Sequence, residues 1–284
     1  MNIDWQNIKE RIKKGVYLAS NSFAMLWNHK ILLIYLTISI STYFLMQMIS
    51  YNLSGYDVCF SSGLQSLGQL FDLSHWHHYL WLLLLTFVYV FLSTFVTIAL
   101  IYHVYKLNKH ESVTFKKSFG RALKKINLIV IWSVIVTMLT YAIQLISNRV
   151  AQPKQFFNPI MLIVSLLGLA WTLFTLMVLP IIALESTTIK DAFKQSKDMV
   201  LAMIPEILSG EFWIGLTALL AMIPFAIPML FNLRIPAVIV LIGTALIFCI
   251  GLIITTVQVI FKTFVYTYYM KPLEELKKLK YPRF

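Results

Sequence analysis

Six long apolar stretches divide this chain of 284 residues, and they constrain its fold more than any other feature. A helix rises about 1.5 Å per residue, so about 20 apolar residues cross the hydrocarbon core of a bilayer. Each stretch reaches that length. The sequence therefore predicts an all-α, polytopic membrane protein with six transmembrane helices arranged as three hairpins. The predicted spans cover about residues 31–51, 79–105, 126–147, 160–184, 211–231 and 237–268.

The shortage of charged residues supports the same class of protein. Apolar residues make up 59% of the chain and charged residues 13%, against roughly a quarter charged in soluble domains. A soluble protein of this length would lack the charge to cover its surface, so lipid is the simplest outer solvent. We expect a single membrane domain over 1–284, with a cytoplasmic amphipathic helix at 1–30 and a cytoplasmic tail at 271–284.

Lys and Arg fall in alternate gaps between the apolar stretches. All but three of the 24 basic residues lie on one side of the predicted membrane, and the exceptions are Arg149, Lys154 and Arg234. Because cytoplasmic loops carry the excess of Lys and Arg, both termini are predicted to be cytoplasmic. The net charge of +12 is concentrated beside the spans, where it suits anionic lipid headgroups. We therefore expect membrane lipids, and no nucleic acid, as partners.

The first 30 residues have the pattern of a helix that lies in the headgroup plane of a membrane. Apolar residues recur there at intervals of three and four, and the basic residues lie elsewhere on the helical wheel. The apolar positions are Trp5, Ile8, Ile12, Val16 and Ala19. The candidate headgroup-binding residues are Lys9, Arg11, Lys13 and Lys14.

Three segments resemble one another, at residues 19–34, 115–130 and 193–208, and their alignment superposes Ser22, Ser118 and Ser196. Each segment precedes an ascending span and a descending span. The unit would be a cytoplasmic amphipathic helix followed by a transmembrane hairpin, repeated three times about an axis along the membrane normal, as in some transporters. Alternatively, the segments look alike because every cytoplasmic entry helix needs the same anchoring residues.

The stretch PIIALESTTIKDAFKQS at 180–196 has a Pro that ends an apolar span, then Glu185, then a short helix with Ala192 and Ser196. With SFGRALKKINLIVIW, which contains Trp132, it resembles a loose group of uncharacterised bacterial inner-membrane proteins. These are related to the membrane domain of glycerophosphodiester phosphodiesterases. The resemblance covers about residues 15–270. It implies a six-helix protein of a bacterial cytoplasmic membrane, and no activity, because the catalytic domain is absent.

A cluster of imidazoles precedes the second span. Imidazole and carboxylate groups this close in sequence suit zinc or copper. The same segment also contains Trp76 and Tyr79, which are typical of the aromatic belt at a membrane interface. Both interpretations stay open. The candidate metal ligands are Asp72, His75, His77 and His78.

Charged residues at membrane depth mark a second candidate site. Glu206 and Glu211 flank the predicted start of the fifth span, and Lys262 interrupts the sixth. We expect a helix over 188–204, a restart of the helix near Glu211, and Lys262 as the partner of Glu211. The alternative is a structural ion pair in which Lys262 extends to the interface.

No catalytic Ser/His/Asp set and no phosphate-binding glycine loop occurs in the sequence. This favours a non-enzymatic membrane protein without a cofactor, which acts on lipids, on a membrane partner or on a second copy as a scaffold or accessory subunit. The first alternative is a small secondary transporter with a polar path near Glu206, Glu211 and Lys262. The second is a membrane lipid enzyme that uses the His cluster or Glu185.

Overall fold

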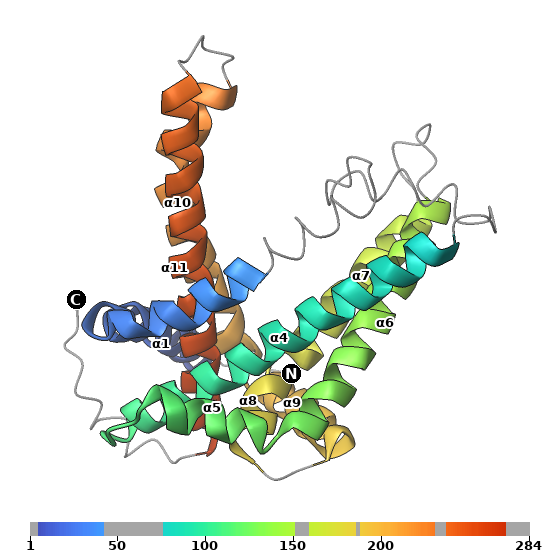
Figure 1. Cartoon of the computed structure of the whole chain (residues 1–284). Helices are drawn as coiled ribbons and strands as arrows, with labels where there is room; N and C mark the ends of the chain where they lie inside the picture. The colour runs from blue at the N-terminus through green and yellow to red at the C-terminus, as the bar shows by residue number, and fades with distance from the viewer. Residues whose placement is uncertain (1–4, 43–75, 151–158, 186–187, 231–236, 271–284) are drawn as a thin grey trace. The chain divides into compact units, whose positions relative to one another are not determined.

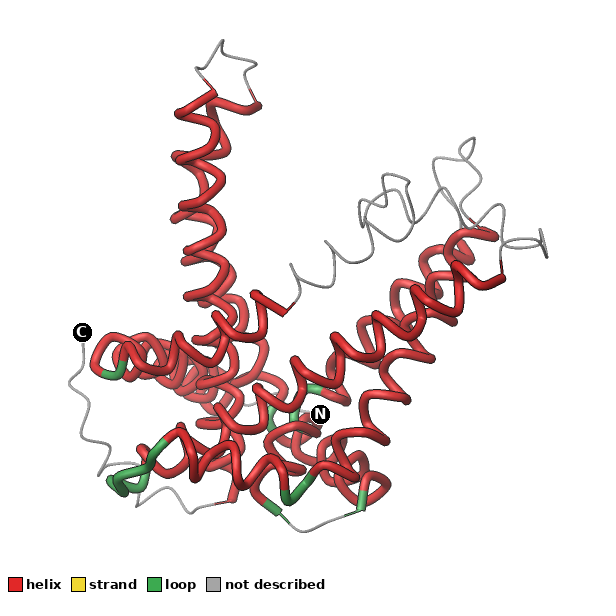
Figure 2. Tube along the Cα trace, viewed as in Figure 1, coloured by secondary structure: helices red, strands yellow, loops and turns green. Residues whose placement is uncertain are grey.

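A computed structural model describes residues 5–42, 76–150, 159–185, 188–230 and 237–270. All regular secondary structure in these ranges is helical (Figure 2), which confirms the predicted all-α class for the described part. Within these ranges five helices are long and apolar enough to cross a membrane, and a sixth is obtained if one bent pair of helices counts as a single span. The chain is therefore a multi-pass membrane protein by length and composition.

The helices follow the predicted apolar stretches, apart from a break within 160–184 and an early start of the fifth span (Figure 1). The predicted span at 31–51 is helical from 30 to 42, and its remainder lies outside the described residues, as does the predicted tail at 271–284. The helices are α1 (Trp5–Asn28), η1 (Lys30–Leu32) continuing as a helix over 33–42, α4 (Trp76–Asn108), α5 (Phe115–Leu123), α6 (Ile126–Val150), α7 (Pro159–Thr175), α8 (Val178–Leu184), α9 (Ile189–Ala202), α10 (Ile204–Leu230) and α11 (Ala237–Met270).

The described helices divide between two compact units. The first unit, within residues 1–37, 100–118 and 198–284, holds α1, α10 and α11 together with the last turns of α4. The second unit, within 38–99 and 119–197, holds most of α4 and α5 and all of α6, α7 and α8.

In the first unit, α1 packs across the antiparallel pair α10 and α11. The face of α1 that meets this pair carries small and apolar residues at intervals of three and four, the period of one helical stripe. Ile12, three residues before Gly15, is 43% exposed at the edge of this face. The buried residues of the stripe are Gly15, Leu18, Ala19, Ser22 and Met25.

The spanning helices leave most of their apolar surface unburied. Between 17% and 33% of the residues in the apolar window of each candidate span are buried within the protein. Large side chains such as Leu167, Phe212 and Leu220 are more than half exposed. Monomeric soluble proteins rarely expose apolar patches that run the length of a helix, whereas lipid covers them at no cost.

Three short breaks separate an amphipathic helix from a following apolar helix. They fall at His29, at Lys124–Lys125 and at Met203, and positions 29, 125 and 203 coincide in the alignment of the three repeat segments. The aligned Ser22, Ser118 and Ser196 are all fully buried. Two later positions of the alignment also agree. The first is buried in all three segments, at Leu26, Ala122 and Val200, and the second is exposed in all three, at Trp27, Leu123 and Leu201. The three segments therefore share a helix break and a pattern of burial, whereas the hairpin of each predicted unit and the rotational symmetry of the repeat stay predictions.

The span predicted as one helix over 160–184 is interrupted at Leu176–Met177, which separates α7 from α8. Pro180 explains the break, because proline has no N–H and its ring clashes with the carbonyl of the residue four positions earlier. Ser196 replaces the lost helical bonds: its hydroxyl donates to the Phe174 carbonyl at 2.5 Å and accepts the Met177 N–H at 3.3 Å. Figure 1 shows the short α8 beside α9.

The fifth spanning helix begins earlier than predicted. The helix expected at 188–204 is present as α9, but α10 starts at Ile204 and runs through Gly210 without a restart near Glu211. Pro205 is accommodated because the first turn of a helix has no intrahelical use for its N–H groups. The predicted restart near Glu211 was wrong, and Gly210 instead allows a close contact with α1 and α11.

Candidate functional site

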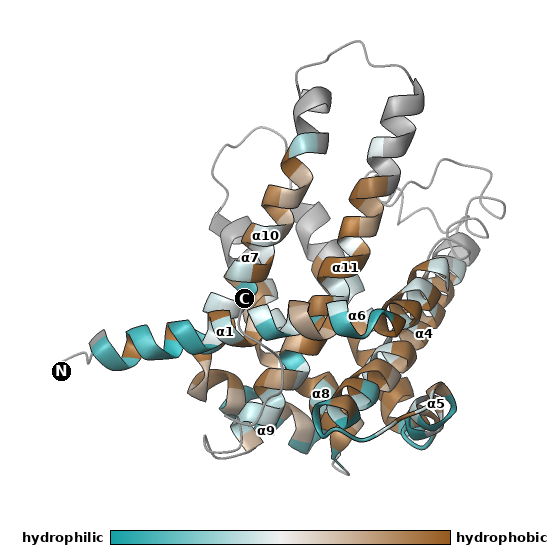
Figure 3. Cartoon of the chain, turned by 90° about the vertical axis from the view of Figure 1, so that its left-hand side faces the viewer, coloured by the Kyte–Doolittle hydropathy of each residue, from teal (hydrophilic) through white to brown (hydrophobic). Residues whose placement is uncertain are grey.

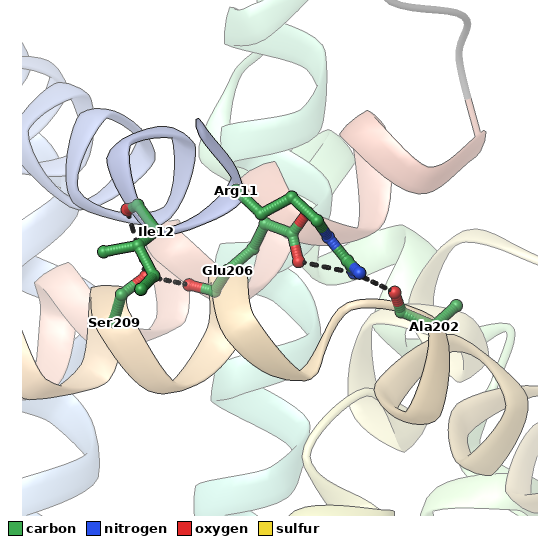
Figure 4. Close-up of polar contacts among 5 residues, drawn as sticks. All are labelled: Arg11, Ile12, Ala202, Glu206 and Ser209. Carbon is green, nitrogen blue, oxygen red and sulfur yellow. Dashed lines mark hydrogen bonds and ion pairs between the residues drawn. The ribbon is translucent and has the colours of Figure 1, made fainter. Parts of the chain in front are cut away.

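Two glycines let α1 and α10 meet with their backbones nearly in contact and let the Phe261 ring of α11 pack against the crossing. A Cβ atom on Gly15 would overlap the Ser209 hydroxyl and the Glu206 carbonyl of α10, and a Cβ on Gly210 would overlap the Phe261 ring of α11. Ser209 Oγ donates to the Ile12 carbonyl at 3.2 Å and lies 3.1 Å from the Glu206 carbonyl (Figure 4). Small residues at helix crossings allow this approach in membrane proteins.

An ion pair between Arg11 and Glu206 stands next to this crossing (Figure 4). Arg11 Nε donates to Glu206 Oε1 at 2.7 Å and Nη2 donates to Oε2 at 2.9 Å, a two-point pairing that fixes both planar groups. Nη2 also donates to the carbonyl of Ala202, the last residue of α9. Since a helix C-terminus carries partial negative charge, Arg11 ties α1 to the end of α9 and to the start of α10.

This pairing separates Arg11 from the other predicted headgroup-binding residues. Lys9 and Lys13 are exposed and Lys14 is partly exposed. Figure 3 shows the hydrophilic colour concentrated along the first turns of α1, while α10 and α11 are mostly apolar. The basic face of α1 is thus free for ligands at Lys9, Lys13 and Lys14.

Glu211 lies one to two turns further along α10 and faces α11. Its Oε2 accepts a hydrogen bond from Gln258 Nε2 at 3.2 Å, and its Oε1 is buried with no hydrogen-bond partner among the described residues. Lys262, one turn after Gln258, lies close enough to interact electrostatically with Glu211 but forms no direct ion pair with it in the described part of the chain. The structure therefore brings together the predicted pair Glu211 and Lys262, and gives Glu206 a different partner.

A second polar cluster in the first unit was not predicted. Tyr35 Oη lies 2.8 Å from His103 Nδ1, which is 3.2 Å from Ser118 Oγ, and all three residues are buried. The Phe115 ring stacks on Tyr35 with ring centres 4.8 Å apart. The signal was present in the sequence, because Tyr35 and His103 are polar side chains inside apolar stretches, but nothing there indicated that they meet.

In the second unit, two cations bind the end of α8. Lys125 Nζ donates to the Glu185 carbonyl at 2.6 Å, and Arg121 donates to the carbonyls of Ala183 and Leu184 at 3.5 and 3.4 Å. Burial, and then the charge of Arg121, lower the pKa of Lys125. Gln195 binds a carboxylate oxygen of Glu185 at 2.9 Å. Cations at a helix C-terminus stabilise it, so this arrangement serves as a cap.

The predicted metal site falls mostly outside the described residues. Asp72 and His75 lie there, and His77 and His78 are in the first turn of α4. Within the described ranges no three His, Cys, Asp or Glu side chains gather as they would around a metal ion. A metal site at 72–78 stays a prediction.

Comparison with known proteins gives one match. No curated protein and no solved structure is similar enough to this chain to match it. The resemblance to the phosphodiesterase-linked membrane domain stays a prediction. Residues 77–273 match a family described as a family of unknown function, DUF6159. Because the match covers well over half of the chain and includes every described helix from α4 to α11, the protein belongs to the DUF6159 family.

Proposed function

We propose that this protein is a non-catalytic, multi-pass membrane scaffold or accessory subunit whose α1 helix binds anionic lipid headgroups. The division of α1 into two faces supports this proposal: one face packs on α10 and α11, and the other presents Lys9, Lys13 and Lys14. Each Lys near an anionic membrane surface contributes about 1 kcal/mol. Three such residues give about 3 kcal/mol, enough to prefer anionic over neutral lipid.

The amphipathic helices of the other two repeat segments, α5 and α9, also have exposed lysines on them or next to them. Exposed lysines are Lys116, Lys117 and Lys124 on α5 and the turn after it, and Lys190, Lys194 and Lys197 on α9. Each of the helices α1, α5 and α9 thus carries a buried serine and has exposed lysines on it or next to it. This supports a protein whose cytoplasmic side contacts headgroups at three places.

Lysine substitution on α1 tests the proposal. In nanodiscs, we expect phosphatidylglycerol to raise the thermal unfolding midpoint of the wild type relative to pure phosphatidylcholine. The triple variant Lys9→Gln, Lys13→Gln, Lys14→Gln should lose most of this gain, and high salt should weaken the wild-type gain as well. Glu10→Gln, which removes an acidic residue from the same helix, is the matched control and should keep the gain. A triple variant with the full wild-type response would contradict the proposal.

The finer topology is part of the same proposal: six spans, both termini cytoplasmic, in the cytoplasmic membrane of a bacterium. The distribution of Lys and Arg supports it. In a background of Cys59→Ser and Cys249→Ser, we expect Gln65→Cys to react with an impermeant maleimide in spheroplasts and Lys116→Cys to react only after lysis. The opposite labelling pattern would reverse the orientation.

One observation favours a second candidate function, a small secondary transporter. Glu206 is neutralised by Arg11, whereas Glu211 keeps an unpartnered oxygen near Lys262 inside the helix bundle. Ionisable groups in that position line ion and proton pathways in transporters. The lipid-enzyme alternative has less support, because Gln195 and Lys125 already bind the side chain and the carbonyl of Glu185.

A further inference from the structure

The position of Glu211 is unusual for an acidic residue. It lies seven residues into the candidate span Ile204–Pro224, which places it roughly 10 Å inside the helix end at about 1.5 Å per residue. Lys262 lies eight residues from the end of the span Leu246–Met270, roughly 12 Å by the same rise. Both residues therefore sit at similar depth on neighbouring, antiparallel helices.

The hydrogen bonds of Glu211 are incomplete for a carboxylate. An ionised carboxylate buried in apolar surroundings requires partners for both oxygens, and otherwise it takes up a proton. Here Gln258 supplies one neutral donor to Oε2, and Oε1 is buried without a partner among the described residues.

Protonation of Glu211 would allow both of its carboxyl oxygens to form hydrogen bonds. A protonated Oε1 gains an O–H donor, and the Gln258 amide has a carbonyl oxygen that can accept it. A carboxylic acid and a primary amide can then form two hydrogen bonds side by side. The existing bond from Gln258 Nε2 to Glu211 Oε2 is already one of the two.

The surrounding charges act in opposite directions. Arg11 and Glu206, brought by α1 and α10, neutralise each other in a two-point pair. Lys262 on α11 lies close enough to Glu211 to interact with it electrostatically. In general a nearby cation favours an ionised carboxylate, whereas apolar surroundings disfavour it. Opposed influences of this kind allow a group to bind and release a proton.

We propose that Glu211, Gln258 and Lys262 form a membrane-embedded site that binds a proton reversibly on Glu211. Gln258 stabilises the protonated acid, and Lys262 sets how readily the proton leaves. The site does not depend on the lipid-binding function proposed above, because it involves α10 and α11 rather than the basic face of α1.

Dicyclohexylcarbodiimide tests the site, since it adds to protonated carboxyl groups that are shielded from water. We expect mass spectrometry of the full-length protein in nanodiscs to find the adduct on Glu211, and the yield to rise as the pH is lowered. Glu206, held by Arg11, and Glu10, exposed on α1, should remain unmodified and provide internal controls.

Three variants separate this proposal from nonspecific labelling. Glu211→Gln should lose the adduct completely, whereas Lys262→Met should increase it at a fixed neutral pH. Gln258→Leu should decrease it, because the protonated acid loses its partner. Each variant is first checked for a wild-type circular dichroism spectrum and gel-filtration profile. Absence of an adduct on Glu211 in the folded wild type, or a yield that responds to neither pH nor Lys262→Met, overturns the proposal.

Discussion

Gly15→Leu is expected to detach α1 from α10 and to cause the largest loss of stability of any single substitution in the first unit. A Cβ at this position already overlaps the Glu206 carbonyl and the Ser209 hydroxyl. Overpacking costs about 1–3 kcal/mol when side chains can adjust, but here a backbone atom of α10 would have to move. The cost therefore exceeds the gain of about 1 kcal/mol that replacing a helical glycine normally brings.

The measurement is the thermal unfolding midpoint in a fixed detergent, combined with limited proteolysis of α1. Gly15→Ala should also lower the unfolding midpoint and expose α1 to proteolysis, but less than Gly15→Leu. Gly120→Ala is the matched control, because Gly120 also lies in an amphipathic helix and no atom lies within 4 Å of its Cβ position. This control should be neutral or slightly stabilising. Equal effects of Gly15→Ala and Gly120→Ala would show that the α1–α10 contact does not hold in the membrane.

Arg11→Leu is expected to destabilise the first unit by about 3 kcal/mol. Glu206 is 4% exposed, so removal of Arg11 leaves a buried carboxylate without its two charged donors. Breaking a buried pair in this way costs about 3–5 kcal/mol, and we take the lower end because the Arg11 side chain is 30% exposed.

The double variant Arg11→Leu, Glu206→Leu should recover most of that loss, because it leaves no uncompensated charge. Arg11→Lys should recover little, since an ammonium group cannot make the two-point pairing or reach the Ala202 carbonyl at the same time. A double-mutant cycle in chemical or thermal unfolding measures the coupling. Additive single effects would mean that the ion pair contributes no coupling energy.

The sequence was most informative about properties that depend only on neighbouring residues in the chain. Hydropathy over about 20 residues depends on no distant partner, so the places of the apolar helices along the chain were predictable, although α10 begins at Ile204 instead of 211. The same holds for the amphipathic entry helices and their aligned serines. The errors came from proline and glycine: Pro180 breaks a span that hydropathy treats as continuous, and α10 runs through Gly210 without the predicted restart near Glu211. Proline acts through its own backbone, which a hydropathy average does not record. Gly210 acts through contact with other helices.

The candidate site was less predictable. Glu206 and Glu211 were identifiable as acidic residues at membrane depth, but their partners come from other helices. Periodicity placed Arg11 among the basic residues of α1 and could not show that it turns toward α10. The contact between Tyr35 and His103 was not predictable for the same reason, because each lies in a different apolar stretch and only the folded chain brings them together.

The separation of 195 residues between Arg11 and Glu206 has a consequence for how the protein is made. Translation proceeds at roughly 5–20 residues per second, so α1 leaves the ribosome about 10–40 s before its acceptor helix exists. During that interval Gly15 has no helix to meet and the guanidinium of Arg11 has no carboxylate. Under the lipid-binding function proposed above, we expect anionic headgroups to be the temporary partners of α1. The exposed Lys9 and Lys13 and the partly exposed Lys14 would then hold the nascent N-terminal helix at the membrane until α10 and α11 are inserted.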